Sequence, residues 1–155
     1  MAGISGTSSG SKDALELMLS RLHHRGPKGK WMHLGERVAL GCCVLPSEAN
    51  HSGRAHAQKA DTVAVIDGHL YSEDGTQLPE ADLLVSLYSK FGSSFVERLD
   101  GDFALCLATD SELILARDPV GVRPLFYGYK DDALYFASEM KALLGLCAQV
   151  EELPA

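Results

Sequence analysis

The chain has 155 residues, a mass of 16.7 kDa and a net charge of −7. Its length predicts one domain, and its acidic balance argues against a nucleic-acid partner, because a negative field repels phosphate backbones. Hydrophobic residues make up 46% of the chain, enough for a buried core. No apolar run reaches the roughly 20 residues that cross a bilayer, so we expect no membrane association.

The first ten residues are small and rich in Gly and Ser, so they fit either an unstructured leader or a short buried strand. They have neither the basic region nor the apolar core of a secretory signal. The four cysteines, two of them adjacent, do not have the spacing of a disulfide framework. We therefore expect a cytoplasmic protein.

A first helix is expected after Ser11, which can cap it, and Gly26 with Pro27 should end it. Spacings of three and four residues place four side chains on one apolar stripe: Leu15, Met18, Leu19 and Leu22. Cations near the end of a helix interact favourably with its dipole. A capping role is therefore expected for the run His23, His24 and Arg25.

The next segments predict two strands, at 37–45 and 62–66, separated by a polar loop at 46–60. A second helix should begin at Pro79, a favoured first-turn residue, and end at Gly92. A short helical turn is expected directly after it, at residues 93–99.

Two antiparallel hairpins are predicted in the second half, followed by a helical turn at 140–146. Their paired segments are 102–108 with 112–118, and 125–129 with 134–138. The strands alternate poorly between apolar and polar residues, which indicates burial on both faces. We therefore expect an α+β fold, a layered sandwich with helices packed outside two antiparallel sheets.

Four residues carry side chains that could bind a metal: Cys42, Cys43, His51 and His56. Adjacent cysteines lack the spacing of structural zinc sites, so burial of the two thiols in a strand is the favoured interpretation, and no metal is predicted. The phosphate-binding Gly-rich motifs are also absent from the sequence, and no cofactor is predicted.

Six short motifs occur in a fixed order along the chain. They are Gly3-Ile4-x-Gly6, residues 24–27 (HRGP), 67–71 (DGHLY), 99–104 (LDGDFA), 116–127 (ARDPVGVRPLFY) and 136–143 (FASEMKAL). This order resembles the class II glutamine amidotransferase domain, the N-terminal nucleophile fold at the front of glutamine-dependent asparagine synthetases. The resemblance covers nearly all of residues 1–155, and it implies that the family's last strands would follow residue 155.

The resemblance also implies a mechanism. In the family, removal of Met1 makes a cysteine the first residue; its thiolate attacks the side-chain amide of glutamine, and its α-amine serves as the base. An Asn side chain and a Gly backbone N–H, from an N-G-E motif, hold the oxyanion. The ammonia passes to a synthetase-type domain or subunit, which the resemblance implies as the partner here.

This sequence departs from the family pattern at its catalytic positions. Ala2 stands at the position of the nucleophile, and loss of a covalent nucleophile costs on the order of 10⁶ in rate. Asp67 stands at the position of the oxyanion-hole Asn, where a carboxylate would repel an oxyanion. Gly68 is retained. No glutaminase activity is therefore expected of the chain as it stands.

The positions that match the glutamine-binding residues are also altered. Val44 replaces the Arg that pairs with the glutamine carboxylate, and His69 replaces the Glu of the N-G-E motif. Glu80 replaces the Asp that binds the substrate amine. Arg37 or Arg54 is a candidate replacement for the Arg that is missing at position 44.

Two explanations fit Ala2: natural loss of the nucleophile, or a Cys→Ala substitution that inactivates a true glutaminase domain. Several altered pocket positions favour natural loss, whereas a replacement for the missing Arg would favour the second explanation. A non-catalytic interaction module is a third alternative. Glutamine or a similar small ligand stays a candidate for binding, and the sequence leaves a homo-oligomer open.

Overall fold

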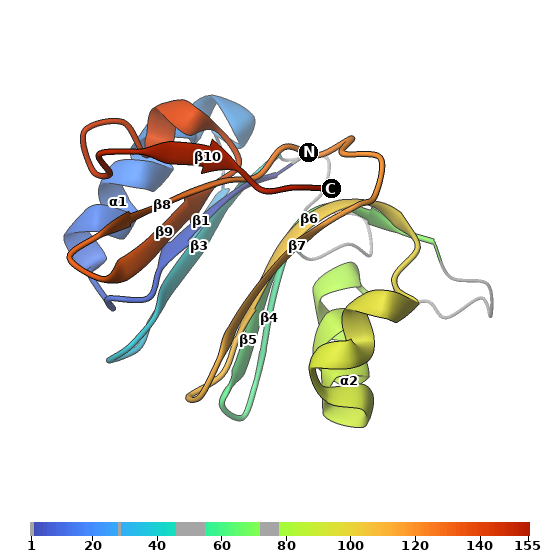
Figure 1. Cartoon of the computed structure of the whole chain (residues 1–155). Helices are drawn as coiled ribbons and strands as arrows, with labels where there is room; N and C mark the ends of the chain where they lie inside the picture. Colours follow the sequence, from blue (N-terminus) through green and yellow to red (C-terminus); the bar gives the residue numbers. More distant parts are fainter. Residues whose placement is uncertain (1, 28, 46–54, 72–77) are drawn as a thin grey trace.

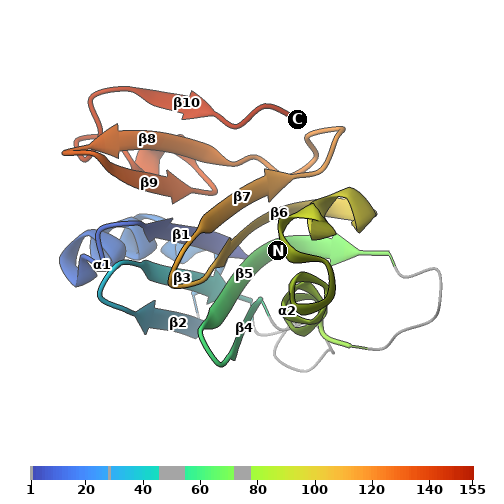
Figure 2. The same ribbon diagram turned by 60° about the horizontal axis from the view of Figure 1, so that its bottom comes forward.

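The computed structural model describes residues 2–27, 29–45, 55–71 and 78–155. In these residues two antiparallel β-sheets face each other, and a helix covers the outer face of each sheet (Figures 1 and 2). The predicted layered α+β sandwich is therefore confirmed.

The larger sheet has the strand order β10-β8-β9-β1-β3-β2. Its strands are β1 (Gly3–Thr7), β2 (Gly29–Leu34), β3 (Ala39–Val44), β8 (Phe126–Lys130), β9 (Ala133–Ala137) and β10 (Val150–Glu152). Helix α1 (Lys12–Arg21) lies on its outer face, and a 3₁₀ turn (His23–Arg25) follows the helix. The predicted cap is present, because the Ser11 hydroxyl accepts a hydrogen bond from the Ala14 N–H at 3.3 Å.

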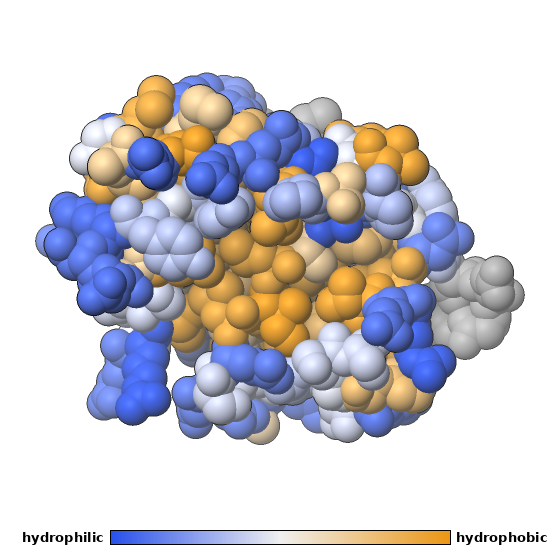
Figure 3. All heavy atoms as spheres, in the orientation of Figure 1, coloured by the Kyte–Doolittle hydropathy of each residue, from blue (hydrophilic) through white to orange (hydrophobic). Residues whose placement is uncertain are grey.

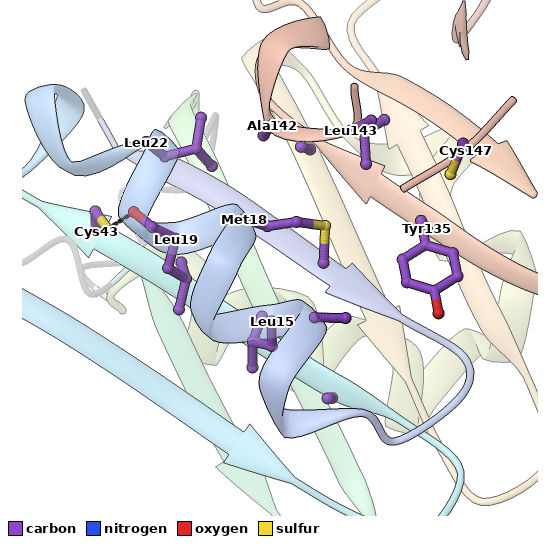
Figure 4. Close-up of a cluster of buried hydrophobic side chains, with 12 residues drawn as sticks. Leu15, Met18, Leu19, Leu22, Cys43, Tyr135, Ala142, Leu143 and Cys147 are labelled. Atoms are coloured by element: carbon purple, nitrogen blue, oxygen red, sulfur yellow. Dashed lines mark hydrogen bonds between the residues drawn. The ribbon is translucent and has the colours of Figure 1, made fainter. Parts of the chain in front are cut away.

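The apolar stripe of α1 forms one hydrophobic layer with the outer face of this sheet. Leu15, Met18, Leu19 and Leu22 are buried against β3, β9 and the segment after the 3₁₀ turn Met140–Ala142 (Figure 4). The Cys43 thiol points into this layer and donates a hydrogen bond to the Leu19 carbonyl (Sγ–O distance 3.6 Å).

The smaller sheet has the strand order β4-β5-β6-β7. Its strands are β4 (His56–Lys59), β5 (Thr62–Leu70), β6 (Gly101–Ala108) and β7 (Leu113–Arg117). Helix α2 (Glu80–Phe91) and the 3₁₀ turn after it (Gly92–Arg98) cover its outer face, as the sequence predicts. Leu84 and Phe95 are fully buried against Leu105 and Leu107 of β6 in this layer.

A third hydrophobic layer lies between the two sheets and contains the fully buried Ile4, Leu40 and Phe136. Hydrophobic side chains are visible in the centre of the face shown in Figure 3, between the sheets. At the β2 and β4 edges, Trp31 stacks on His56 with 4.3 Å between ring centroids, so an aromatic contact joins the two sheets there.

Strand β1 resolves the two alternatives for the N-terminal segment, because it lies inside the larger sheet and pairs with both β3 and β9. Such a position requires small residues. A Cβ on Gly6 would lie 2.5 Å from Leu40 Cδ2 and 2.6 Å from Phe136 Cε1, well inside van der Waals contact. The small composition of this segment therefore reflects close packing and not an unstructured leader.

Four strand predictions need correction. Strand β10 was not predicted at all. Strand β2 was not predicted, and β4 lies inside the segment 46–60 that was expected to be a loop; residues 46–54 of that segment are outside the described residues. Both are edge strands, whose solvated side weakens the apolar pattern. Strand β5 runs on to Leu70 and does not end at residue 66, so Asp67 and Gly68 lie within it and not in a turn. The predicted helical turn at 140–146 is shorter, at 140–142.

No helix in the described part of the chain is long and apolar enough to cross a membrane. Among the same residues, no group of three or more His, Cys, Asp or Glu side chains could hold a metal ion. His51, one of the four residues considered for a metal, lies outside the described ranges.

We predict that Gly6→Ala lowers the free energy of unfolding by about 1–3 kcal/mol, the usual cost of overpacking a tight interior. Gly35→Ala is the matched control, because the nearest atom to a Cβ there is the Val38 carbonyl oxygen at 3.3 Å; its effect should stay within about 0.5 kcal/mol. Urea unfolding measures both. Equal effects of the two substitutions would contradict the close packing described for β1.

Candidate functional site

Ala2 lies at the start of β1, where the two sheets and the turn after β9 meet, and it is only 3% exposed. Its backbone N–H donates a hydrogen bond to Asp67 Oδ1 at 2.8 Å. The pairing of Gly3 with Cys43 of β3 sets this position along the sheet. The strand register thus brings residue 2 of the larger sheet against residue 67 of the smaller one.

The Asp67 carboxylate is fully buried and is surrounded by hydrogen-bond donors. Besides the Ala2 N–H, an Nη of Arg25 lies 2.5 Å from Oδ2, and an Nη of Arg123 lies 4.0 Å from Oδ1. A buried carboxylate is tolerated only where cations and hydrogen bonds replace its hydration. Two guanidinium groups therefore lie beside this buried carboxylate, one in direct contact and one at the limit of an ion pair.

Arg25 connects three parts of the site. Its Nε donates to the Ala2 carbonyl at 2.9 Å, one Nη binds Asp67, and the other Nη lies 3.2 Å from Glu139 Oε1. Glu139 also contacts His24 Nε2 at 2.8 Å and Lys141 Nζ at 3.1 Å. Burial by itself would raise the pKa of Glu139, but the hydrogen bonds from His24, Lys141 and Arg25 outweigh it and lower that pKa.

Arg123 binds a second carboxylate, that of Asp102. Its Nε and one Nη lie 2.9 Å and 2.6 Å from Asp102 Oδ2, and the Tyr71 hydroxyl donates to Oδ1 at 2.9 Å. Burial would raise the pKa of Asp102, but the hydrogen bonds from Arg123 and Tyr71 lower it overall. The hydrogen bond to Asp102 raises the pKa of Tyr71, so Tyr71 acts here as a neutral donor.

The loop that carries Arg123 is fixed by Asp118, a buried carboxylate at the end of β7. Asp118 accepts hydrogen bonds from the backbone N–H groups of Val120, Val122 and Arg123, at 2.9 to 3.2 Å. Burial would raise the pKa of Asp118, but the backbone donors lower it overall. The conformation of this loop therefore depends on an ionised Asp118.

The positions expected to bind substrate lie around this cluster. His69 and Glu80 approach each other, with 3.4 Å between Nδ1 and Oε1, and His69 is largely exposed. Gly68 has φ +128°, and a Cβ there would overlap the Asp102 carbonyl oxygen, so this backbone position requires glycine. Ala2, Asp67 and Gly68 thus lie together, with the His69–Glu80 pair beside them.

Val44 lies at the end of β3 and packs against the glycine-rich segment that includes Gly26 and Gly29. Arg37 cannot replace the missing Arg at position 44. It precedes β3, and the six residues of that strand put roughly 20 Å between the two positions. Arg54 lies outside the described residues.

Sequence reasoning did not assign site roles to several residues that build this cluster. They are Arg25, Tyr71, Asp102, Arg123 and Glu139. Arg25 is expected from the sequence to cap the first helix, but its guanidinium contacts Asp67 and Glu139 instead. All five lie within the six motifs that occur in fixed order along the sequence, so membership of a motif was the one sequence feature that could have pointed to them.

The four cysteines offer no nucleophile among the described residues. All four are buried, and burial raises the pKa of each thiol, in Cys42 to about 12. They are protonated at neutral pH and react poorly. The cluster around Ala2 consists of carboxylates and cations that pair with one another, an arrangement that stabilises structure and supplies no attacking atom.

Comparisons with known proteins agree with this architecture. A family model described as a glutamine amidotransferase domain matches residues 1–154. The glutamine-hydrolyzing asparagine synthetase 3 of Arabidopsis thaliana is 34% identical over 83% of this chain and 25% of its own length. The corresponding asparagine synthetase B of Escherichia coli is 32% identical over 93% of this chain and 29% of its own length. The chain spans about a quarter of the length of these relatives.

A solved structure shares the fold. Glutamine phosphoribosylpyrophosphate amidotransferase from B. subtilis, in complex with ADP and GMP, superposes with a TM-score of 0.74 at 19% identity. The match covers 91% of this chain and 42% of that one. The predicted N-terminal nucleophile-type sandwich is therefore confirmed at the level of the fold.

We predict that Arg25→Leu lowers the free energy of unfolding by about 3–5 kcal/mol at pH 7, because it leaves the buried Asp67 without its nearest cation. The double variant Arg25→Leu with Asp67→Asn should lose clearly less than the sum of the two single changes. Lys141→Leu, which removes an exposed partner of Glu139, should cost less than about 1 kcal/mol. Urea unfolding gives all four values, and an additive double variant would argue against the ion pair.

The acid dependence of stability should include a contribution from Glu139. Its pKa is lowered in the folded protein, so the stabilisation is present above its ordinary value of 4.5 and is lost as the pH falls through the lower folded value. Glu139→Gln should therefore reduce the loss of stability below about pH 4.5. Glu16→Gln is the control, because its contact with Lys12 is exposed. An unchanged acid profile in Glu139→Gln would contradict the assigned contacts.

Proposed function

We infer the function of this chain from the premise that it belongs to the glutamine amidotransferase domain family, whose model matches residues 1–154. It is related to asparagine synthetases, and we propose that it is a member that does not hydrolyse glutamine. The observation that carries the proposal is the buried Ala2–Asp67 pair, with a methyl group and a carboxylate at the two positions where the family chemistry needs a thiol and an amide.

The first support for this proposal is the missing nucleophile. Ala2 is 3% exposed, and its methyl group cannot form a thioester. The described cysteines are buried thiols with raised pKa values, and none can take over this step. By analogy with serine hydrolases, removal of the attacking residue costs on the order of 10⁶ in rate.

The second support is the electrostatics of Asp67. An oxyanion is stabilised by donors that point at the developing charge. Asp67 is an acceptor instead, with one oxygen on the Ala2 N–H and the other on Arg25. Its charge would oppose a tetrahedral oxyanion formed beside it, so transition-state stabilisation is lost together with the nucleophile.

The third support concerns recognition of the glutamine carboxylate. Val44 offers no charge at the position of the family's Arg, and Arg37 lies at the far end of β3. The two guanidinium groups close to Ala2 are already paired, Arg25 with Asp67 and Glu139, and Arg123 with Asp102. A free amino acid would have to displace one of these pairs in order to bind there.

We further propose that the retained scaffold serves a synthetase-type domain or subunit as a brace. The relatives whose names describe glutamine-hydrolyzing asparagine synthetases are about four times as long as this chain, so in them this domain accompanies a larger part. A small ligand similar to glutamine is a second candidate occupant of the site. The four unpaired cysteines fit a reducing cytoplasmic setting.

Restoring the nucleophile alone should not restore catalysis. We expect no steady ammonia release from glutamine by the unmodified chain or by Ala2→Cys, because Asp67 still faces the oxyanion position. Ala2→Cys with Asp67→Asn tests whether the amide is the missing element, and the E. coli asparagine synthetase B is the positive control. The measurement is a coupled ammonia assay.

A second measurement separates loss of chemistry from loss of binding. Calorimetry with glutamine should give no binding heat for the unmodified chain. Efficient ammonia release by Ala2→Cys alone, with glutamine binding to the unmodified chain, would identify an inactivated glutaminase and overturn the proposal.

A further inference from the structure

The larger sheet extends past the smaller one at its β8–β10 end. The smaller sheet packs through β5 on β1 and β3, and it leaves the inner face of β8 and β10 to one side of that contact (Figure 2). Tyr129 of β8 is 60% exposed there. A cavity of about 330 Å³ lies at this place, lined by Tyr127, Gly128, Tyr129, Ala148, Gln149 and Glu151. None of these residues belongs to the cluster around Asp67.

The strand register gathers the larger side chains of this cavity on one face of the sheet. Strands β8 and β10 pair antiparallel, with Tyr127 opposite Glu151. Because side chains alternate along a strand, Tyr129 and Gln149, each two residues further on, fall on the same face. The Tyr127 hydroxyl donates a hydrogen bond to Glu151 Oε2 at 2.9 Å. This hydrogen bond fixes the first ring and the carboxylate relative to each other.

The rings of Tyr127 and Tyr129 stand at right angles to each other. Their planes are 89° apart, and their centroids are separated by 6.3 Å. The face of an aromatic ring attracts a cation that lies within about 6 Å of the ring centroid. A cation placed about 4.5 Å from both rings, along the normal of each, requires perpendicular rings with centroids about 6.4 Å apart. The geometry of this pair therefore fits two walls of a cation site.

The carboxylate of Glu151 carries the charge of the cavity, since the other lining side chains are neutral. The adjacent Glu152 is paired with Arg117 at 2.6 Å, whereas Glu151 forms no ion pair within the described parts of the chain. Lys130, the residue after Tyr129, is directed to the opposite face of β8. An unneutralised carboxylate beside two aromatic rings favours a positively charged ligand.

We propose that this cavity binds a small organic ammonium ion whose nitrogen carries methyl groups. The methyl groups contact the faces of Tyr127 and Tyr129, and the charge lies beside Glu151. Such an ion is weakly hydrated, so it loses little when it enters between two rings. One carboxylate supplies too few ligands for a metal ion, and the volume lies at the lower end of the range for small-molecule sites. The inference holds whether or not the domain hydrolyses glutamine.

The test titrates choline chloride into the full chain and follows the backbone amide signals by NMR. We expect saturable shifts at residues 127–129 and 148–151, with a dissociation constant in the millimolar range. The neutral analogue 3,3-dimethylbutan-1-ol has the shape of choline without its charge, and it should bind at least about fivefold more weakly. Sodium chloride at the same ionic strength controls for screening of surface charges.

Two pairs of variants separate the contributions of the ring and the charge. Tyr129→Leu keeps an apolar side chain but removes the ring, and it should weaken choline binding about 3–30-fold, whereas Tyr129→Trp should bind at least as tightly as the unmodified chain. Glu151→Gln should also weaken binding several-fold. Glu152→Gln is the matched control, because it removes the same charge from the opposite face of β10 and should leave binding unchanged.

Free choline and the headgroup of phosphatidylcholine carry the same trimethylammonium group, and vesicles separate these two sources. Sedimentation with phosphatidylcholine vesicles measures headgroup binding, with phosphatidylglycerol vesicles as the control. We expect the chain to bind free choline and to stay in solution beside both kinds of vesicle, because the cavity offers too little apolar area to enter a bilayer. Retention on phosphatidylcholine vesicles that Tyr129→Leu abolishes would assign the same site to a headgroup.

Any of three results would overturn the inference: no binding of choline either free or on vesicles, equal binding of free choline and its neutral analogue, or equal effects of Glu151→Gln and Glu152→Gln. Unchanged affinity in Tyr129→Leu would equally exclude a role of the ring. The comparison of choline with the neutral analogue uses the unmodified chain, so it decides the question even if a variant does not fold.

Discussion

The buried carboxylate of Asp67 is the group on which the rest of the site depends. An ionised side chain without solvent needs compensation from every direction, and each of its partners comes from a different part of the chain. Ala2 comes from the start of β1, Arg25 from the turn after α1, and Arg123 from the loop after β7. One charge therefore joins segments that are far apart in the sequence at the place where the two sheets meet.

The two arginines near Asp67 each bind a second carboxylate as well. Arg25 also holds Glu139, which fixes the turn after β9, and Arg123 also holds Asp102 at the start of β6. The loop of Arg123 keeps its conformation because Asp118 accepts three of its backbone N–H groups. In this arrangement the charged side chains of the described residues pair with one another across several elements, and these pairs stabilise the fold. The proposed loss of the family reaction is therefore compatible with membership of the family.

Much of the fold follows from local pattern. The stripe of α1, the cap at Ser11, the second helix and the two hairpins are set by spacings, caps and turns of neighbouring residues, and the structure contains them. The sequence pattern did not predict the edge strands β2 and β4, because a strand solvated on one side lacks a continuous apolar pattern. The extension of β5 through Asp67 was not predicted either, because Asp followed by Gly normally indicates a turn.

The sequence by itself determined the family, through motifs whose order matters more than any one of them, and it determined that position 2 carries no nucleophile. Only the tertiary structure decided what the altered residues do together. Arg25 and Arg123 are nearly a hundred positions apart, and no local pattern shows that both serve one carboxylate. The exclusion of Arg37 likewise needed the length and direction of β3. Charge pairing in a buried site is a property of three-dimensional distance, which strand register creates and sequence spacing does not express.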